Sequence, residues 1–309
     1  MTSADTPPAL DSWLHRLNPN PGPPLVTAVA APCDATALAA AVEAARAGLI
    51  RPILIGPRAA IVAAADAARC DIAAFETIDV RDDVEAASRA VAEVVAGRAG
   101  ALMKGSLHTD VLLSAVLAAP SLRTGRRMSH CYVIALGASA EPLILTDTVM
   151  NVLPNLDAKA DIVRNAIDLG AKIGLGPLRV AILSAIETVN PRIPSTVDAA
   201  ALAKMADRGQ IVGALVDGPL ALDDALDPQA AALKKIASPV AGRANILVVP
   251  DLEAGNILVK ELEFVAHADV AGIVLGASVP IILTSRAETV RARVASCALA
   301  AHVAAAMVC

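Results

Sequence analysis

Aromatic side chains are almost absent from this sequence. Its 309 residues include one Trp, one Tyr and two Phe, although 56% of the residues are hydrophobic. The core must therefore be built from Ala, Val, Ile and Leu, which suit thin layers of helix packed on sheet. A chain of 309 residues is long for one small domain and sufficient for two packed ones. We expect a layered α/β protein.

Clustered positive charge is also missing. The chain has 26 Lys and Arg against 31 Asp and Glu, a net charge of −5, and no long basic run occurs. Nucleic-acid phosphates are bound by clustered Lys and Arg, so the sequence argues against a nucleic acid as partner.

The cysteines form neither a CxxC pair nor a cluster with histidine. They are scattered at Cys33, Cys70, Cys131, Cys297 and Cys309. This pattern argues against a zinc site and a disulfide framework, and we expect no bound metal. An odd number of cysteines fits a reducing cytosol.

A secretory signal and a membrane span are not expected either. The first ten residues, MTSADTPPAL, are acidic and contain proline, unlike a signal peptide. The most apolar stretch, Val294–Cys309, is shorter than the roughly 20 apolar residues that span a bilayer. We expect a packed C-terminal helix in a cytoplasmic protein that does not bind membranes.

Strand-like apolar runs alternate with helical patterns from Leu25 onward. The run VTAVAA precedes a helical segment that has Asp34 as a candidate N-cap and Gly48 at its end. Apolar strands that alternate with helices predict parallel sheets covered on both faces. The alternation breaks around Met128–Asp147, where only GASAE separates two strand-like runs. We place a domain junction there and expect two α/β lobes with a cleft between them.

Polar residues collect where several of these strands end. In α/β proteins, ligands bind beyond the carboxyl ends of the strands. Glycines, helix N-termini, Lys and Arg at such ends together predict an anion site. The segments are Met103–Ser106, Leu145–Thr148, Val216–Pro219, Pro250–Asp251 and Leu283–Arg286.

Each of these residues also has a structural interpretation. Asp147 and Asp217 could cap the elements that follow them, and we interpret His108 and His130 as helix-cap or strand residues rather than catalysts. The sequence contains neither a Walker A motif nor GxGxxG. Their absence argues against a nucleoside triphosphatase and a Rossmann dehydrogenase.

Several motifs, in order along the chain, resemble the phosphate acetyl/butyryltransferase family (phosphotransacylases). They are LMKGSLHT, LTDTVMNVLPN, RVAILSA, VDGPLALDDAL, SPVAGRANILVVPDLEAGNILVK and GASVPIILTSRA. The resemblance implies reversible transfer of a short acyl group between coenzyme A and inorganic phosphate, by direct attack in a ternary complex. It implies acyl-CoA, phosphate and acyl phosphate as ligands, no tightly bound cofactor, and a homodimer.

The resemblance also implies a fold. Family members have two α/β domains of the isocitrate/isopropylmalate dehydrogenase-like type with the site in the interdomain cleft, and the final helix returns to the first domain. We therefore expect a first domain of residues 1–138 plus 287–309 and a second domain of residues 139–286.

The family's Ser-Arg pair matches Ser285 and Arg286. By resemblance, Arg286 holds the phosphate and Ser285 hydrogen-bonds the reacting carbonyl or oxyanion, where negative charge develops. The acetyl-type aspartate seven residues after the serine is Ala292 here, and an acetyl-type arginine is Leu113.

The form LTSRAET is closer to the butyryl-type branch. Because the acetyl-type aspartate is missing, Glu288 and Asp147 are the candidate bases for the coenzyme A thiol. The candidate substrate-binding residues are Lys104, Gly105, Thr109, Asp217, Gly218, Pro219, Asp251, Gly255, Asn256 and Lys260.

Within VPDLEAGNILVK we expect Gly255 and Asn256 to form the tight entry to a helix, with Asp251 holding the loop. Lys260 follows about one turn later on the same face. Two other functions stay open: a non-catalytic relative that binds coenzyme A or an acyl phosphate, and a metal- and NAD-dependent dehydrogenase of the same fold. The second requires acidic or histidine metal ligands for which the sequence shows no convincing set.

Overall fold

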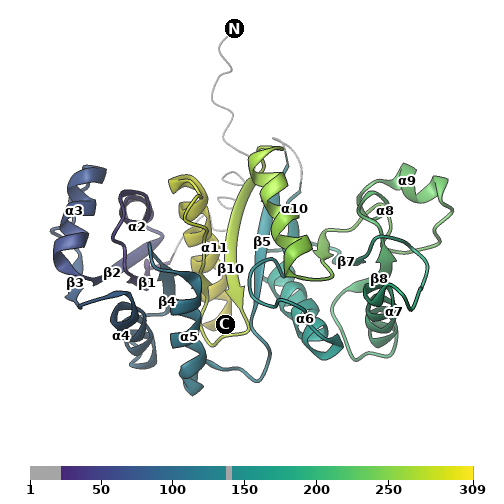
Figure 1. The fold of residues 1–309 in the computed structure, drawn as a ribbon, viewed down its shortest axis with the longest axis horizontal. Helices are drawn as coiled ribbons and strands as arrows, with labels where there is room; N and C mark the ends of the chain where they lie inside the picture. The colour runs from purple at the N-terminus through teal and green to yellow at the C-terminus, as the bar shows by residue number, and fades with distance from the viewer. Residues whose placement is uncertain (1–21, 137–140, 309) are drawn as a thin grey trace, which may run out of the picture. The chain divides into compact units, whose positions relative to one another are not determined.

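The computed structural model describes residues 22–136 and 141–308. Its contacts separate two compact units, which are described in turn. The first unit contains the described residues up to Arg126 together with those from Ala271 onward, and the second unit is Arg127–Val270 (Figure 1). The chain therefore leaves the first unit once and returns to it at its C-terminal end.

The first unit contains a mostly parallel sheet. Its strand order is β3-β2-β1-β4-β11-β10, with β10 antiparallel to β11 and the other neighbours parallel. The strands are β1 (Leu25–Ala30), β2 (Ile50–Gly56), β3 (Glu76–Asp79), β4 (Ala101–Lys104), β10 (Asp269–Leu275) and β11 (Ile281–Ile282). Most of β1, β2 and β4 is buried, as their apolar sequences predict.

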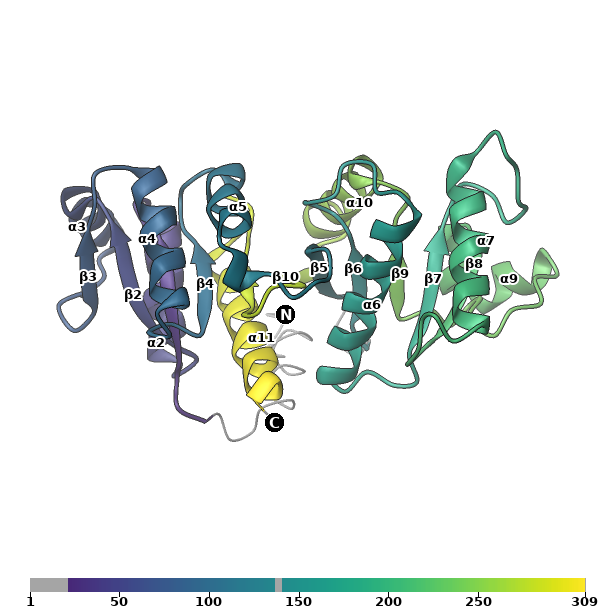
Figure 2. The same cartoon turned by 90° about the horizontal axis from the view of Figure 1, so that it is seen from below.

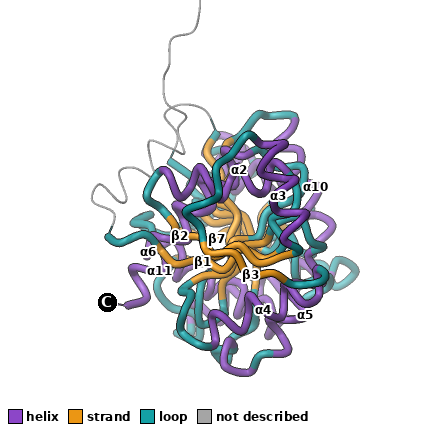
Figure 3. Tube along the Cα trace, turned by 90° about the vertical axis from the view of Figure 1, so that its left-hand side faces the viewer, coloured by secondary structure: helices purple, strands orange, loops and turns teal. Residues whose placement is uncertain are grey.

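Helices cover both faces of this sheet. Two of them, α2 and α3, lie on one face and α4 and α5 on the other (Figures 1 and 3). The last helix, α11, packs against α2. The bounds are α2 (Ala35–Arg46), α3 (Arg58–Ala68), α4 (Asp83–Val95), α5 (Thr109–Ala118), the 3-10 turn η1 (Pro120–Leu122) and α11 (Val290–Val308).

The predicted caps of the first helix are present. Helix α2 begins after Asp34, whose side chain accepts a hydrogen bond from the Ala37 N–H at 2.7 Å. It ends before Gly48, which has a φ of +71° that favours glycine. Local sequence therefore determines where this helix starts and stops.

Within the second unit the sheet strands lie in the order β5-β6-β9-β7-β8. Strands β5 and β6 are antiparallel, and the remaining pairs are parallel. The strands are β5 (Ser129–Ala135), β6 (Leu143–Thr146), β7 (Arg179–Leu183), β8 (Leu215–Leu220) and β9 (Ile246–Val248).

Helices α6 and α7 cover one face of the second sheet, which is nearer the viewer in Figure 2, and α8 and α10 lie on the opposite face (Figure 1). Both faces are thus covered, as a mostly parallel sheet requires. The bounds are α6 (Leu156–Lys172), α7 (Pro194–Asp207), α8 (Leu222–Leu226), α9 (Pro228–Leu233) and α10 (Leu252–Phe264).

The boundaries of the units differ from the predicted 1–138 plus 287–309 and 139–286. Residues 127–136 group with the second unit, because β5 pairs with β6. Residues 271–286 group with the first unit, because β11 pairs with β4. The predicted gap GASAE falls largely on residues 137–140, which lie outside the described residues.

The predicted C-terminal helix is confirmed as α11. By length and composition alone, its segment Val290–Met307 could cross a membrane. However, it packs against α2 and buries Arg293 and Ser296, and both features suit a helix packed within a protein core.

Candidate active site

The carboxyl ends of β4 and β11 lie next to each other in the first unit. The two strands are parallel, with Ile282 opposite Met103. Lys104 ends β4, and Ser285 and Arg286 follow shortly after β11. These predicted site residues therefore emerge at one edge of the sheet, where α/β proteins bind ligands.

Two buried charged side chains hold the turn that carries Ser285 and Arg286. The Glu288 carboxylate accepts a hydrogen bond from the Ser285 N–H at 2.8 Å. The Arg293 guanidinium donates to the Ser285 carbonyl at 2.9 Å and to the Glu288 carbonyl at 3.4 Å. Glu288 is 1% exposed and Arg293 is fully buried, whereas Arg286 is exposed. The buried side chains therefore fix the backbone of the turn, and Arg286 extends from it into the solvent.

Arg293 is a site residue that the sequence did not reveal. It lies in the alanine-rich helix α11, in the segment RARVASCALAA, where an arginine is normally read as a solvated surface residue. The one signal in the sequence is its position eight residues after Ser285, in the first turn of the helix that follows the site. Its burial depends on how α11 packs, which periodicity does not show.

Lys104 places a further buried cation at this edge. The side chain is 2% exposed, and its Nζ donates to the carbonyl oxygens of Gly105 at 3.3 Å and Leu107 at 3.1 Å. Burial, followed by the positive charges of Arg293 and Arg286, lowers the pKa of Lys104 to about 8. Three cationic side chains therefore gather at this edge, which suits an anionic ligand.

Gly105 and Thr109 have structural explanations in addition to their predicted roles. A Cβ at Gly105 would lie 2.2 Å from the Ala31 carbonyl oxygen, so only glycine fits between the ends of β4 and β1. Thr109 is the first residue of α5 and is partly exposed. In sequence, Gly105 follows Lys104 directly and Thr109 lies five residues after it.

His108 occupies the N-cap position of α5, but its side chain makes no capping hydrogen bond. The ring is exposed, and its Nδ1 lies 3.2 Å from Nη2 of Arg286. The prediction that His108 is a helix-cap residue is confirmed by its backbone position, while its side chain is directed elsewhere. The imidazole instead belongs to the Ser285–Arg286 site.

Asp147, in the second unit, is surrounded by hydrogen-bond donors. Its Oδ1 accepts from the N–H groups of His130, Val149 and Met150 at 3.1–3.2 Å, and its Oδ2 from both nitrogens of Asn151. The side chain is 3% exposed. This arrangement favours a role in shaping the loop after β6 over a role as proton acceptor.

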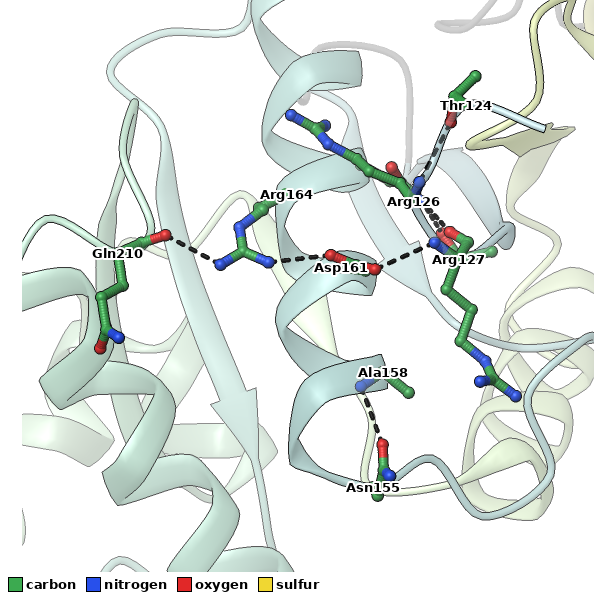
Figure 4. A network of polar contacts seen from close by, with 10 residues as sticks. Thr124, Arg126, Arg127, Asn155, Ala158, Asp161, Arg164 and Gln210 are labelled. Atoms are coloured by element: carbon green, nitrogen blue, oxygen red, sulfur yellow. Dashed lines mark hydrogen bonds and ion pairs between the residues drawn. The ribbon is translucent and has the colours of Figure 1, made fainter.

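The start of β5 is anchored to α6 by a polar network. Asp161 accepts from the Arg127 N–H at 3.0 Å and from the Arg164 guanidinium at 2.9 Å (Figure 4). Arg164 also donates to the Gln210 carbonyl at 3.0 Å, and the Arg127 side chain donates to Asn151 at 2.6 Å. These arginines are thus engaged in holding the second unit together.

The VDGP motif forms part of β8. Asp217 accepts from the Gly218 N–H at 2.8 Å, and a Cβ at Gly218 would lie 2.7 Å from the Ile182 carbonyl oxygen. The next residue is Pro219, also within β8. Asp217, Gly218 and Pro219 therefore lie inside a strand rather than beyond its end, and Gly218 is required by the close packing of β8 on β7.

The segment VPDLEAGNILVK starts its helix earlier than predicted. Asp251 is the N-cap of α10 and accepts from the Ala254 N–H at 2.9 Å. The expectation that Gly255 and Asn256 form the helix entry is therefore wrong, because both lie inside the first turns. A Cβ at Gly255 would lie 2.8 Å from the Asp147 carbonyl oxygen, which explains the glycine.

Lys260 and Asn256 make local contacts in the second unit. Lys260 Nζ pairs with Glu263 at 2.9 Å and lies 5.1 Å from the centre of the Phe264 ring. The Asn256 amide donates to the Thr148 carbonyl at 3.4 Å. Asn256 thus connects α10 to the loop that Asp147 organises.

A cluster of three carboxylates in the second unit surrounds the ammonium group of Lys234. Glu187, Asp223 and Asp224 are the described residues grouped closely enough to hold a metal ion. Lys234 Nζ lies 2.9, 3.1 and 2.8 Å from their respective oxygens. Burial and a hydrogen bond with Glu187 raise the pKa of Asp224. We interpret the group as a structural ion-pair network.

The structure thus brings together one set of predicted residues at the first unit's sheet edge. That set is Lys104, Gly105, Thr109, Ser285, Arg286 and Glu288, to which the structure adds His108 and Arg293. The remaining predicted residues lie in the second unit, around β8, α10 and the loop after β6.

Comparison with known proteins gives a consistent result. A family model described as phosphate acetyl/butaryl transferase matches residues 80–301. A phosphate acetyltransferase of Rhizobium meliloti is 58% identical over 279 residues, covering 90% of this chain and 88% of that protein. A phosphate butyryltransferase of Clostridium acetobutylicum is 41% identical over 278 residues, covering 90% of this chain and 92% of that protein.

A solved structure agrees with these relatives. The crystal structure of a branched-chain phosphotransacylase from Enterococcus faecalis V583 has a TM-score of 0.79 and 30% sequence identity, covering 91% of this chain and 99% of that one. The family match, the relatives and the α/β architecture lead to one conclusion: the chain belongs to the phosphate acetyl/butyryltransferase family.

Proposed function

We propose that this enzyme transfers a short acyl group reversibly between coenzyme A and inorganic phosphate. The observation that carries the proposal is the exposed Arg286 beside Ser285, on a turn fixed by buried Glu288 and Arg293. A guanidinium can bind two phosphate oxygens at once, and Lys104 adds positive charge beneath it. Family membership supports the same reaction.

In the direction of acyl-phosphate synthesis, a phosphate oxygen attacks the thioester carbon, and the C–S bond breaks to release coenzyme A. Arg286 holds the phosphate, and the Ser285 hydroxyl donates a hydrogen bond to the carbonyl oxygen as it becomes negative. Both substrates are bound together, so catalysis depends on positioning and on electrostatic stabilisation. We assign Glu288 and Asp147 to positioning, because their carboxylates already accept backbone N–H groups.

The second unit contributes substrate-binding surface in this proposal. Its members are Asp217, Gly218, Pro219, Asp251, Gly255, Asn256 and Lys260. From the family resemblance we further propose an isocitrate/isopropylmalate dehydrogenase-like fold with an interdomain cleft, a cytoplasmic homodimer, and no tightly bound cofactor or metal.

We propose acetyl as the preferred acyl group. The motif LTSRAET is closer to the butyryl-type branch, but the identity to a phosphate acetyltransferase, 58%, exceeds that to a phosphate butyryltransferase, 41%. The test is thiol release from acetyl-, propionyl- and butyryl-CoA by purified protein, with and without phosphate. Phosphate-dependent release that is fastest with acetyl-CoA is expected.

Absence of phosphate-dependent release with every thioester would reject the enzyme and favour the non-catalytic relative. The dehydrogenase alternative predicts a rise in melting temperature with Mg²⁺ and NAD together, which the proposed transferase does not.

A further inference from the structure

The exposed imidazole of His108 has an unusual neighbour, the guanidinium of Arg286 at 3.2 Å. Arginine has only donors, so His108 Nδ1 must be the acceptor of this hydrogen bond and carries no proton in this arrangement. The neutral ring then has its proton on Nε2. If an anion binds Arg286 in place of the imidazole, the Nδ1 lone pair becomes available at the site.

The reaction requires a group that exchanges a proton with coenzyme A. A free thiol has a pKa near 8.5, so only a few per cent of it is thiolate at pH 7, a rough figure. The group must reach the thiol and change its protonation state near neutral pH. Imidazole is the side chain that does so without a perturbed environment.

The other titratable groups of the site are less suited to this exchange. Glu288 is 1% exposed, and one of its carboxylate oxygens accepts the Ser285 N–H. Lys104 is 2% exposed, and its Nζ is directed at two backbone carbonyls. His108 is exposed and adjacent to the arginine that we assign to phosphate.

We infer that His108 exchanges the proton of the coenzyme A thiol, an inference that rests on the proposed acyl transfer. With acyl phosphate on Arg286, Nδ1 takes the S–H proton, and the thiolate attacks the acyl carbon. The bond between that carbon and the phosphate oxygen breaks, and phosphate leaves with its electron pair. In the opposite direction the imidazolium returns the proton to the departing thiolate.

Charged groups from several elements surround His108. Without substrate, the ring faces the cation Arg286, and Lys104 is buried at the same edge of the sheet. The acids near this edge include Asp110 in the first turn of α5, Glu288 in the turn after β11, and Asp34, whose charge acts on Lys104. A bound phosphate adds negative charge beside the ring and stabilises the imidazolium.

The test is the pH dependence of kcat for acetyl phosphate plus coenzyme A in the variant His108→Asn. The asparagine carbonyl can still accept from Arg286, but the side chain does not titrate. We expect a loss of about 10²-fold at pH 7. The remaining rate should rise about tenfold per pH unit toward the thiol pKa near 8.5, because thiolate must now form in solution.

The matched control is His267→Asn, at an exposed histidine whose φ of +52° asparagine tolerates. This variant should keep the wild-type pH dependence of kcat. A second variant, His108→Gly, preserves an N-cap that helices accept, and added imidazole should restore part of its rate.

Two results would overturn the inference. One is a His108→Asn enzyme with wild-type kcat and pH profile. The other is a raised KM for acetyl phosphate with unchanged kcat, which would show that His108 only positions Arg286. An inactive wild-type enzyme would reject the proposed function itself, and with it the inference, so the two failures are distinguishable.

Discussion

Charged side chains that are buried beneath one exposed arginine are the main feature at the scale of single residues. Lys104, Glu288 and Arg293 are nearly inaccessible, yet their polar atoms contact the backbone around Ser285 and at the end of β4. Burying charge is costly unless it is paired and hydrogen-bonded. Here the hydrogen bonds to the backbone offset that cost, and they tie the buried charges to the turn that carries Arg286.

The variant Arg286→Lys tests whether the site needs only the positive charge of Arg286 or also the planar geometry of its guanidinium. Lysine keeps the positive charge but cannot bind two phosphate oxygens in a planar fork, so kcat/KM for phosphate should fall by about 10²-fold, roughly 3 kcal/mol. The measurement is initial rate against phosphate concentration. Arg51→Lys, at an exposed arginine near the start of β2, is the control and should behave as wild type. An unchanged phosphate dependence in Arg286→Lys would remove Arg286 from the site.

Lys104 should make stability depend on pH in the alkaline range. Its pKa is about 8 in the folded chain, against an ordinary value of 10.5. Between these values the unfolded chain binds the proton and the folded chain does not, so the free energy of unfolding increases as pH rises. We expect urea unfolding to show wild type gaining about 3 kcal/mol relative to Lys104→Met from pH 8 to pH 10.5. A difference between the two proteins that does not vary with pH would contradict the assignment.

At the scale of elements, the turn between β11 and α11 is the functional unit. Its shape comes from a side-chain cap by Glu288 and from Arg293, which reaches back from the helix. A similar hydrogen bond sets the start of α10, where Asp251 caps the helix four residues before the predicted entry at Gly255. In both places a carboxylate that accepts a hydrogen bond from a backbone N–H fixes where the helix or turn begins.

Glu288→Gln tests whether Glu288 is a positioning residue or a base. The glutamine carbonyl can accept the Ser285 N–H as the carboxylate does, so activity should fall much less than the 10²–10⁴-fold expected when a general base is removed. Glu288→Ala, which removes the acceptor, should be severely impaired in kcat. A Gln variant as inactive as the Ala variant would indicate that Glu288 carries the proton.

At the scale of the whole molecule, chain order and spatial order differ. The second unit is one continuous segment, whereas the first unit needs β10, β11 and α11 from the C-terminal end. A domain drawn along the sequence alone therefore cuts through a sheet.

The thermal unfolding of two fragments of the chain tests this topology. A fragment of residues 1–126 lacks β11, the neighbour of β4, and α11, which packs against α2, so it should show no cooperative thermal unfolding by circular dichroism. The fragment Arg127–Val270 retains all five strands of the second sheet and should unfold cooperatively. A cooperative transition in the 1–126 fragment would refute the interdependence of the two chain ends.

The sequence by itself determined the α/β class, the caps of α2 and the family, because these depend on local periodicity and on contiguous motifs. The same motifs supply the prediction that Ser285 and Arg286 are the reactive pair. Only the tertiary structure decided which units the strands β5 and β11 join, that Arg293 is buried beneath the turn, and that His108 contacts Arg286 at a sequence separation of 178. Strand pairing and side-chain burial depend on segments far apart in the chain, and no local pattern records them.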